Sequence, residues 1–331
     1  MPPIFLSKQS RKGSTFMELF RPFEPVQTDT LPTGSNWIGQ VKWDGVRIVA
    51  HAREGQVNLV NRHGRDRTKA YPELVESLAP LARQGCILDG EVVAFAHGKP
   101  SFYRVLQRDR ARHPANVQVL CSQLPVVYMV FDIVWAGGRP LHGLPFADRQ
   151  EHLTTILKEN EFVRLVASEP DTESLWRAVC DIGMEGIVVK DVTSTYAFGG
   201  KDRRWQKRKH RRNAAAVIGG VAVKDGQYSA LLLGVYDGRG QLQYIGRTGA
   251  GTLGTRQWVE LMQQALAYSS TSCPFAHLPA RMPREVIWTM PIISVKVSFL
   301  EWTPDGTLRH PLLEGVLEIS PQMCTMDGAD A

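Results

Sequence analysis

The chain has 331 residues and a formal net charge of +6; 43% of its residues are hydrophobic and 22% are charged. These proportions are typical of a soluble globular protein and exclude a disordered or fibrous chain, and no apolar run reaches the roughly 18 residues that a transmembrane helix needs. At about 150 residues per domain, we expect two domains. The five cysteines are scattered and form no C-x-x-C pair, which argues against a zinc site or a disulfide framework and favours a reducing compartment.

Positive charge is concentrated in one short segment. Residues 201–212 hold eight Lys and Arg and one Asp, a local charge of +7 that exceeds the net charge of the whole chain. Arginine outnumbers lysine by 27 to 12, and its guanidinium suits bidentate phosphate contacts. A basic segment with one tryptophan predicts a polyphosphate partner such as nucleic acid, although a solvated surface run or a basic linker has the same composition.

Strand-like runs alternate with helical patterns over residues 37–209, after an irregular lead-in over residues 1–36. Alternating or continuous apolar residues predict strands at 48–52, 57–61, 86–95, 125–135 and 186–191. The first two strands should form a hairpin with Glu54 and Gly55 at its turn.

Three helices are predicted in the same part of the chain. The first covers residues 72–82, where Pro80 should end or kink it. The second should begin with Asp148 as its N-cap, and the third should begin with Asp171 as its N-cap and end at Gly183.

The pattern changes after the basic segment. Strands are predicted at 214–223, 229–236, 241–247, 285–289 and 294–302. A helix is predicted from Thr255 to Ala267. Five short strands with one helix suit a small Greek-key barrel such as an OB-fold.

The hexapeptide Lys42-Trp43-Asp44-Gly45-Val46-Arg47 is the most informative one in the chain. Lysine and aspartate are rarely buried unless they are paired or used. A lysine acts as a nucleophile when its amine is neutral, which requires nearby cations or burial to lower its pKa from the reference value of about 10.4. Taken alone, the K-x-D-G pattern favours a structural turn.

Five further motifs follow the hexapeptide in a defined order. They are Asn61-Arg62-His63-Gly64, Asp89-Gly90-Glu91, Phe131-Asp132-Ile133-Val134, Glu185-Gly186-Ile187-Val188-Val189-Lys190 and Trp205-Gln206-Lys207-Arg208-Lys209. In this order the set resembles the covalent nucleotidyltransferases and, within them, the bacterial ATP-dependent DNA ligases. Residues 231–251 and 299–311 also resemble OB-domain segments of bacterial end-joining ligases and of their stand-alone relatives.

The resemblance implies an α+β fold. An adenylation (nucleotidyltransferase) domain with antiparallel sheets and flanking helices is expected over residues 1–212, and a C-terminal OB-fold barrel over residues 213–331. The implied activity is ATP-dependent sealing of 5′-phosphate/3′-hydroxyl nicks in DNA repair or end joining, through lysyl-AMP and adenylated DNA. Each step is an in-line phosphoryl transfer, so the site must neutralise charge and align the nucleophile with the leaving group. ATP and Mg²⁺, which Mn²⁺ can replace, are the implied cofactors.

Residue roles are implied by the matching motif positions. Lys42 would be the nucleophile, Asp44 would orient the metal's water shell or basic partners, and Lys190 and Lys207 would meet phosphates. Nucleotide contacts are implied for Gln40, Val41, Arg47, Arg62, Glu91, Phe131 and Lys209. Phe131 would stack on adenine, unless it is plain core packing. Glu185 and Glu91 are the implied Mg²⁺ ligands.

DNA contacts are expected from the arginines of the basic segment that have no motif role. These are Arg203, Arg204, Arg208, Arg211 and Arg212. In a strand, Trp205, Lys207 and Lys209 would share the face that points into the site. We expect a two-domain monomer in the bacterial cytoplasm, associated with the nucleoid and not with a membrane, that acts on nicked duplex DNA alongside end-binding or repair proteins.

The sequence departs from the end-joining ligases after Pro311. Those ligases carry an Arg and an Asp there that help to orient pyrophosphate, whereas residues 313–319 are mostly apolar in this chain. Either self-adenylation is slow, or Arg309 substitutes. The alternatives are an RNA-end ligase or capping-type guanylyltransferase, and a degenerate, non-catalytic nick-binding protein.

Overall fold

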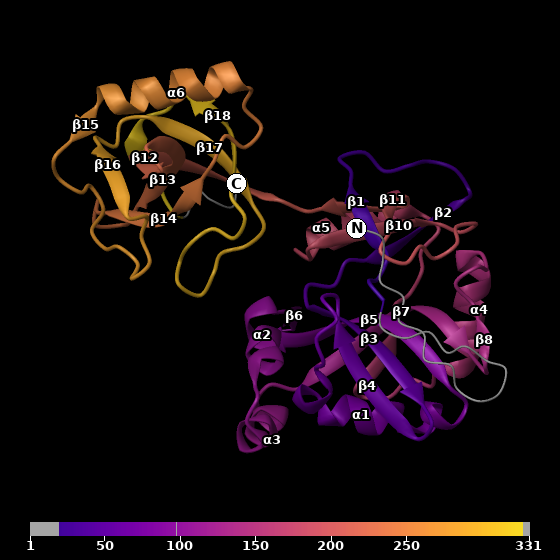
Figure 1. Ribbon diagram of the computed structural model, residues 1–331. Helices are drawn as coiled ribbons and strands as arrows, with labels where there is room; N and C mark the ends of the chain where they lie inside the picture. Colours follow the sequence, from indigo (N-terminus) through magenta and orange to yellow (C-terminus); the bar gives the residue numbers. More distant parts are fainter. Residues whose placement is uncertain (1–19, 97, 327–331) are drawn as a thin grey trace. The chain divides into compact units, whose positions relative to one another are not determined.

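The computed structural model describes residues 20–96 and 98–326. The chain divides into two compact units between His210 and Arg211, two residues before the expected boundary. Each unit is described by itself (Figure 1). No helix in the described ranges is long and apolar enough to cross a membrane.

A seven-stranded sheet forms the larger layer of the first unit, with the order β4-β3-β5-β7-β8 and with β6 and β9 added to β5 and β7. Its strands are β3 (Val46–Arg53), β4 (Gln56–Asn61), β5 (Cys86–Ala96), β6 (Lys99–Pro100), β7 (Val126–Ala136), β8 (Arg139–Pro140) and β9 (Val163–Leu165). All pairs are antiparallel except β7 with β9. The predicted hairpin is confirmed, because Glu54 and Gly55 both adopt positive φ at its turn.

A four-stranded sheet forms the second layer, with the order β1-β11-β10-β2. Its strands are β1 (Glu24–Gln27), β2 (Trp37–Val41), β10 (Gly186–Asp191) and β11 (Lys201–Lys209). Strand β1 runs parallel to β11. The expected irregular lead-in is therefore wrong at β1, because a four-residue strand has too few positions for a pattern and its partner lies far away in the sequence.

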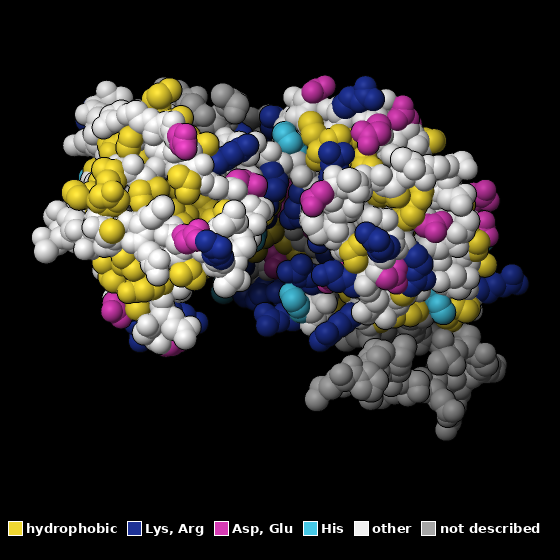
Figure 2. Space-filling view, turned by 90° about the horizontal axis from the view of Figure 1, so that it is seen from above, with side chains coloured by type: hydrophobic (Ala, Val, Ile, Leu, Met, Phe, Trp, Pro, Cys, Tyr) yellow, Lys and Arg dark blue, Asp and Glu magenta, His cyan; other side chains and the backbone are white. Residues whose placement is uncertain are grey.

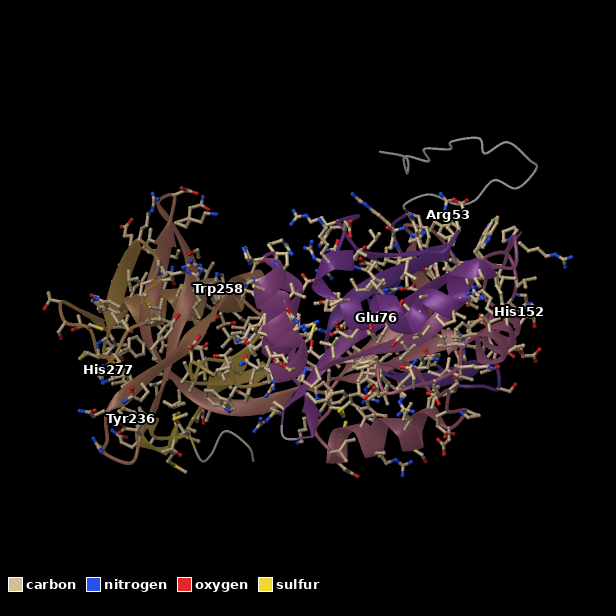
Figure 3. All side chains as sticks on the ribbon, turned by 90° about the horizontal axis from the view of Figure 1, so that it is seen from below. Arg53, Glu76, His152, Tyr236, Trp258 and His277 are labelled. Carbon is tan, nitrogen blue, oxygen red and sulfur yellow. The ribbon has the colours of Figure 1, made fainter. Side chains whose placement is uncertain are left out.

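In the described part of the first unit, five α-helices flank these sheets. They are α1 (Pro72–Leu78), α2 (Phe102–Arg110), α3 (Pro114–Gln123), α4 (Phe146–Ile156) and α5 (Thr172–Asp181). The 3₁₀ turns η1 (Thr68–Ala70) and η2 (Ala79–Arg83) lie before and after the first of them. Helix α1, which carries Glu76, and helix α4, which carries His152, lie against the seven-stranded sheet (Figure 3). Helices α2 and α3 were not predicted; α3 buries only Val117, so it shows no apolar stripe.

The predicted helix ends have different outcomes. Helix α1 ends at Leu78, just before Pro80, and Asp171 caps α5 by accepting a hydrogen bond from the Ser174 N–H at 3.0 Å, so both predictions are confirmed. Asp148 is not a cap. Helix α4 begins directly after Pro145, which places Asp148 within the first turn.

Side chains of the larger sheet alternate between two cores. On one face, Ile48 and Leu88 pack with α1 and α4. On the other face, Val49 and Ile87 pack with Trp205 of β11. The two sheets of the first unit therefore contact each other through a shared apolar and aromatic cluster, and polar residues of these facing sides come close together.

The second unit is a curled sheet covered by one long helix, α6 (Thr255–Ala267). Its strands are β12 (Arg212–Lys224), β13 (Gln227–Tyr236), β14 (Leu242–Thr248), β15 (Ser269–Ser270), β16 (Glu285–Thr289), β17 (Ser294–Phe299) and β18 (Leu312–Leu317), followed by the 3₁₀ turn η3 (Pro321–Met323). The long strand β12 pairs with β17 along its first half and with β16 along its second half. Helix α6 packs Leu261, Met262 and Ala265 against this sheet.

Strand β18 was not predicted, although it pairs with β17 along most of its length. It covers the apolar residues that follow Pro311, so these residues have a structural role in the sheet. Most of the large apolar side chains that are exposed in the described residues lie in the second unit, where they appear as yellow patches (Figure 2).

Candidate active site

Glycine at position 45 lets the hexapeptide approach the larger sheet. A Cβ built on Gly45 would lie 2.2 Å from the Val92 carbonyl oxygen, which no side chain tolerates. On the other side, the Lys42 N–H donates to the Gly186 carbonyl at 2.9 Å. The segment between these contacts therefore connects β2 of the small sheet to β3 of the large sheet.

Lys42, Glu185 and Lys209 form the charged centre of the site. The Lys42 ammonium donates to Glu185 Oε2, and Lys209 Nζ lies 3.0 Å from Glu185 Oε1. Burial alone would raise the pKa of the Glu185 carboxyl, but the two ammonium groups outweigh burial and hold this pKa below its ordinary value. One carboxylate thus balances two lysines, and the cluster has a surplus positive charge.

Gly186 fixes the position of Glu185 at the start of β10. Its φ is +142°, and a Cβ there would lie 2.1 Å from the Arg208 carbonyl oxygen. The Glu185 carbonyl also accepts from the His210 N–H at 2.9 Å. The Glu-Gly pair of the motif is therefore required by close backbone packing against β11 as well as by its charge.

Two further carboxylates, Glu91 and Asp44, interact electrostatically with this charged centre. Burial raises the pKa of Glu91 to about 8, with Lys42 and Arg47 opposing the rise and Glu185 and Asp44 adding to it. Because a nearby cation favours the ionised form of such a carboxyl, Glu91 is suited to bind a cation. Among the described residues, no group of three or more His, Cys, Asp or Glu side chains forms a complete metal site.

Lys207 lies on the same face of β11 as Lys209 and Trp205, as the alternation predicts. It is paired with Val188 of β10. Burial lowers the pKa of Lys207, and the charges of Lys42 and Lys209 lower it further. Lys207 therefore adds to the surplus positive charge.

The structure places Lys190, which is expected to meet phosphates, among buried side chains. Its residue is only 2% exposed, and its ammonium lies 4.0, 4.5 and 4.7 Å from the ring centroids of Trp205, Phe131 and Phe146. Burial lowers its pKa to about 7. In this structure the Lys190 ammonium lies inside an aromatic cage, and its contact with phosphates stays a prediction.

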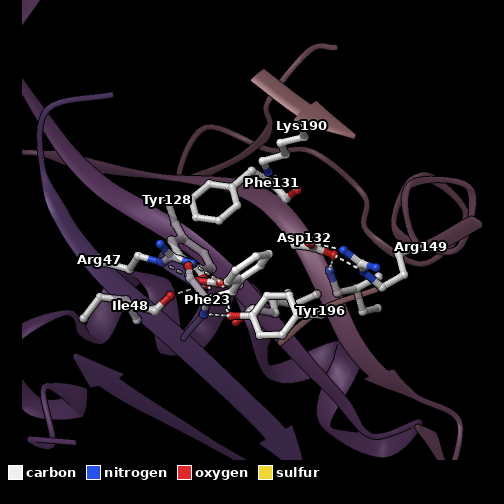
Figure 4. A network of polar contacts seen from close by, with 12 residues as sticks. Phe23, Arg47, Ile48, Tyr128, Phe131, Asp132, Arg149, Lys190 and Tyr196 are labelled. Atoms are coloured by element: carbon white, nitrogen blue, oxygen red, sulfur yellow. Dashed lines mark hydrogen bonds and ion pairs between the residues drawn. The ribbon is translucent and has the colours of Figure 1, made fainter. Parts of the chain in front are cut away.

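Phe131 is the extra residue of a β-bulge in β7, since Asp89 pairs with Asp132 and Gly90 pairs with Val130. The bulge turns the ring toward the small sheet, where it is partly buried. Arg47 Cζ lies 4.9 Å from the ring centroid (Figure 4). Core packing and adenine stacking are thus both compatible with the position of Phe131, because the residue packs in the core and also presents its ring beside the charged residues.

Gln40, Val41 and Arg62 are not brought together. Gln40 is buried and donates to Ser168 Oγ at 3.1 Å. The Val41 side chain lies on the face of β2 opposite to that of Gln40, where it packs near α5. Only the Val41 backbone is therefore available to a nucleotide that binds on the Lys42 side. Arg62 is exposed in the turn after β4, where its Nε donates to His63 Nε2 at 3.1 Å.

The five arginines assigned to DNA have different surroundings. Arg203 is exposed. Arg204 forms a bidentate pair with Asp202 at 2.9 and 2.7 Å, and Arg208 lies 4.1 Å from the ring centroid of Trp176. Within the second unit, Arg212 lies 5.6 Å from the ring centroid of Phe299.

Arg211 makes hydrogen bonds within its own unit. Its guanidinium donates to Ser298 Oγ and O at 2.9 and 3.0 Å and to the His310 carbonyl at 2.6 Å. These contacts use the side chain to fix the start of β12 against β17. Arg211 is therefore engaged within the second unit, and its expected contact with DNA stays a prediction.

Sequence reasoning missed two polar residues beside the site. Asp89 lies in a quoted motif but was given no role, and it is fully buried and bonded to Arg47. Tyr196 belongs to no motif, and its hydroxyl donates to Asp89. An aspartate within an apolar strand was a usable signal for the first residue, whereas nothing in the sequence marks the second.

Two family descriptions match the chain. The ATP dependent DNA ligase domain matches residues 19–209, and the ATP dependent DNA ligase C terminal region matches residues 224–318. The chain belongs to the ATP-dependent DNA ligases. The fold class expected from the motifs, an adenylation domain followed by an OB-fold domain, is confirmed for this ligase.

Several relatives cover most of this ligase. It is 32% identical over 288 residues to the multifunctional non-homologous end joining protein LigD of Mycobacterium bovis, covering 85% of this chain and 36% of the relative. It is 29% identical over 246 residues to DNA ligase C2 of Mycolicibacterium smegmatis, covering 71% and 67%. A solved mycobacterial DNA ligase D complexed with ATP and MES is 29% identical with a TM-score of 0.54, covering 92% of this chain and 98% of that one. The ligase thus spans about a third of the length of LigD.

Proposed function

We propose that this ligase seals 5′-phosphate/3′-hydroxyl nicks in duplex DNA through an AMP group carried on Lys42. The observation that carries the proposal is the charged centre, in which Glu185 contacts both Lys42 and Lys209 and Lys207 lies on the same face. A nucleophilic amine beside surplus positive charge suits attack on a polyphosphate.

In the first step, the Lys42 nitrogen attacks the α-phosphate of ATP. A P–N bond forms, the bond from the α-phosphorus to the bridging oxygen breaks, pyrophosphate leaves, and the nitrogen loses a proton. Lys207 and Lys209 stabilise the charge on the phosphate oxygens, and Phe131 supplies an apolar face for adenine. In the second and third steps, the 5′-phosphate of the nick takes the AMP from Lys42, and the 3′-hydroxyl then displaces AMP.

The residues present fit a divalent cation. Glu185 and Glu91 supply hard oxygen ligands, Asp44 would orient the water shell of the ion, and the raised pKa of Glu91 fits a carboxyl that a cation would help to ionise. With no complete protein cage among the described residues, water and phosphate oxygens would fill the remaining positions, as Mg²⁺ prefers; Mn²⁺ would do the same. When bound, the ion neutralises charge on the phosphates.

In this proposal, the exposed part of the basic segment (residues 201–212) binds DNA, and Arg203 makes the largest contribution. The relatives named for non-homologous end joining support a place in DNA end joining. A bacterial cytoplasmic location and end-binding partners belong to the same proposal. The chain acts as a monomer.

Intact-mass measurement tests the proposal directly. Incubation with ATP and Mg²⁺ should add the mass of one AMP to the protein, and the adduct should then seal nicked DNA. No adduct with ATP would support the non-catalytic alternative, while an adduct with GTP or sealing of nicked RNA in preference to DNA would support the capping or RNA-ligase alternatives. The apolar β18 predicts slow adduct formation if the missing Arg and Asp matter.

The role of Arg203 is tested by a salt titration of nicked-DNA affinity. Arg203→Ala should weaken binding and flatten the dependence of log K on log salt by about one unit, because one fewer phosphate contact releases fewer counterions. Arg204→Ala is the matched control, since Asp202 already engages that guanidinium, and its slope should change less. Equal slopes for both variants and the unmodified protein would exclude Arg203 from the DNA contact.

A further inference from the structure

A closed cycle of hydrogen bonds lies beside Phe131 (Figure 4). Asp89 accepts from Arg47 on both oxygens, at 2.9 and 2.6 Å, and its Oδ2 also accepts from the Tyr196 hydroxyl at 2.5 Å. The Tyr196 oxygen accepts from the Phe23 N–H at 3.1 Å. The Phe23 carbonyl accepts from Arg47 Nη2 at 2.8 Å and closes the cycle.

The cycle joins four separate segments of the first unit. Phe23 directly precedes β1, Arg47 lies in β3, Asp89 lies in β5, and Tyr196 lies in the connection from β10 to β11. Strand β1 belongs to the small sheet and strands β3 and β5 belong to the large sheet. The cycle therefore ties the small sheet, at whose strand ends the charged centre lies, to the large sheet, which carries Phe131.

The cycle is sealed from water at three of its four members. Phe23 and Asp89 are fully buried, and Tyr196 is 3% exposed. In such surroundings a satisfied hydrogen bond is strong, and an unsatisfied group is costly. Trp205 adds packing, with ring centroids 4.9 Å from Phe23 and 5.7 Å from Tyr196. The orientation of Arg47 is thus determined by its partners.

Arg47 in turn restrains Phe131. Its Cζ lies 4.9 Å from the centroid of that ring, and Lys190 Nζ lies 4.5 Å from it. Phe131 lies in a bulge, where it lacks a directly opposed partner on β5, so side-chain contacts such as these fix the ring.

We propose that Tyr196 is a positioning residue for the nucleotide: its hydroxyl, acting through Asp89, holds Arg47 against Phe131 and so presents the ring that receives adenine. This inference rests on the proposed function, because it requires that ATP binds with its base at Phe131. Loss of the hydroxyl removes a donor from Asp89 and leaves the Phe23 N–H buried without its acceptor. Arg47 and the ring then lose their fixed orientation, while Lys42 keeps Glu185.

The test compares two Tyr→Phe variants of the full chain in an adenylation assay with varied ATP. Tyr128→Phe is the matched control, because the Tyr128 hydroxyl is also buried and donates to the carbonyls of Ile48 and Leu88 at 2.9 and 3.2 Å, while its side chain packs in the core on the opposite face of the sheet. Tyr196→Phe should raise KM for ATP about tenfold with kcat within about twofold. Tyr128→Phe should leave KM unchanged.

Other results overturn the inference. A lower kcat or a smaller active fraction at unchanged KM would mean that Tyr196 only supports folding, and an equal rise in KM in both variants would mean that any buried hydroxyl has this effect. Altered sealing of pre-adenylated nicks with normal ATP dependence would assign the cycle to DNA instead. If Tyr196→Phe does not fold, Asp89→Asn, which keeps the shape but removes the charge facing Arg47, must show the same rise in KM. An unmodified protein that forms no AMP adduct would refute the proposed function itself, a result distinct from all of these.

Discussion

Two contacts between cations and a carboxylate in the first unit differ in their charge balance. Arg149 and Asp132 are fully buried and form a bidentate pair at 2.8 and 2.9 Å, and Arg149 also donates to the carbonyls of Leu144 and Ser194. Glu185 instead shares its carboxylate between Lys42 and Lys209. The first contact is complete in charge and in hydrogen bonds, whereas the second has a surplus cation.

The difference separates a structural ion pair from one prepared for a substrate. A balanced, satisfied pair offers nothing to a ligand, and removing one partner leaves an uncompensated buried charge. An unbalanced cluster that is partly open to solvent, as Lys42 is with 21% of its side chain exposed, gains when an anion arrives. The balance of charge and the completeness of the hydrogen bonds thus distinguish these two contacts more clearly than burial alone.

The largest effect should come from removing Lys42, the proposed nucleophile. Lys42→Ala should abolish AMP adduct formation, lowering its rate by at least about 10³-fold, because the variant lacks the amine that is proposed to carry AMP. Sealing of pre-adenylated nicked DNA should survive in part, since Lys42 is not the nucleophile in the last step. Intact-mass measurement and a sealing assay check both expectations, and an adduct on the variant would move the nucleophile elsewhere.

Neutralising the shared carboxylate should have the next largest effect. Glu185→Gln removes the charge that balances two lysines and also removes the proposed metal ligand, so adenylation and sealing should both fall by about 10²-fold or more. Rates of the two steps at ordinary Mg²⁺ concentration are the measurement. Activity equal to that of the unmodified protein would exclude Glu185 from both steps.

Breaking the complete pair should act on stability instead. Asp132→Asn leaves Arg149 buried without its counter-charge and should lower the free energy of unfolding by about 3–5 kcal/mol. Urea denaturation measures the loss, and adduct formation per folded molecule should remain close to normal. A variant with full stability and no adduct formation would place this pair in the chemistry.

The effect of the caged Lys190 on stability depends on pH. Its pKa of about 7 lies below the ordinary value because of burial, with Asp132 and Asp89 opposing this shift and Arg47 and Arg149 adding to it. Between pH 7 and about 10 the unfolded chain keeps a proton on this lysine that the folded chain has lost, so the Lys190 contribution to stability rises with pH by at most about 1.4 kcal/mol per unit. Relative to the unmodified protein, Lys190→Met should therefore be most favourable near pH 7 and lose this advantage toward pH 10. Parallel stability curves for the two proteins would contradict the caged, largely neutral lysine.

Local patterns predicted most strands and helices of this ligase, and their failures have local causes. Strand β12 and helix α6 have long apolar patterns, and both were predicted within two residues. Strand β1 has only four residues, and both β1 and β18 are formed by pairing, with β11 and β17 respectively, so neither was predicted. The cap at Asp171 needs only three residues of context, whereas the start of α4 depends on Pro145.

The sequence by itself determined the order of the motifs, the alternation that places Lys207 and Lys209 on one face, and the proximity of Lys42 to a glycine turn. Tertiary structure decided which charges meet. The contacts of Tyr196 with Asp89 and with Phe23 join residues 107 and 173 positions apart, and the caging of Lys190 requires rings from β7, β11 and α4. The physical reason is that side-chain direction along a strand follows from local backbone geometry, whereas burial and charge balance depend on which sheets pack together.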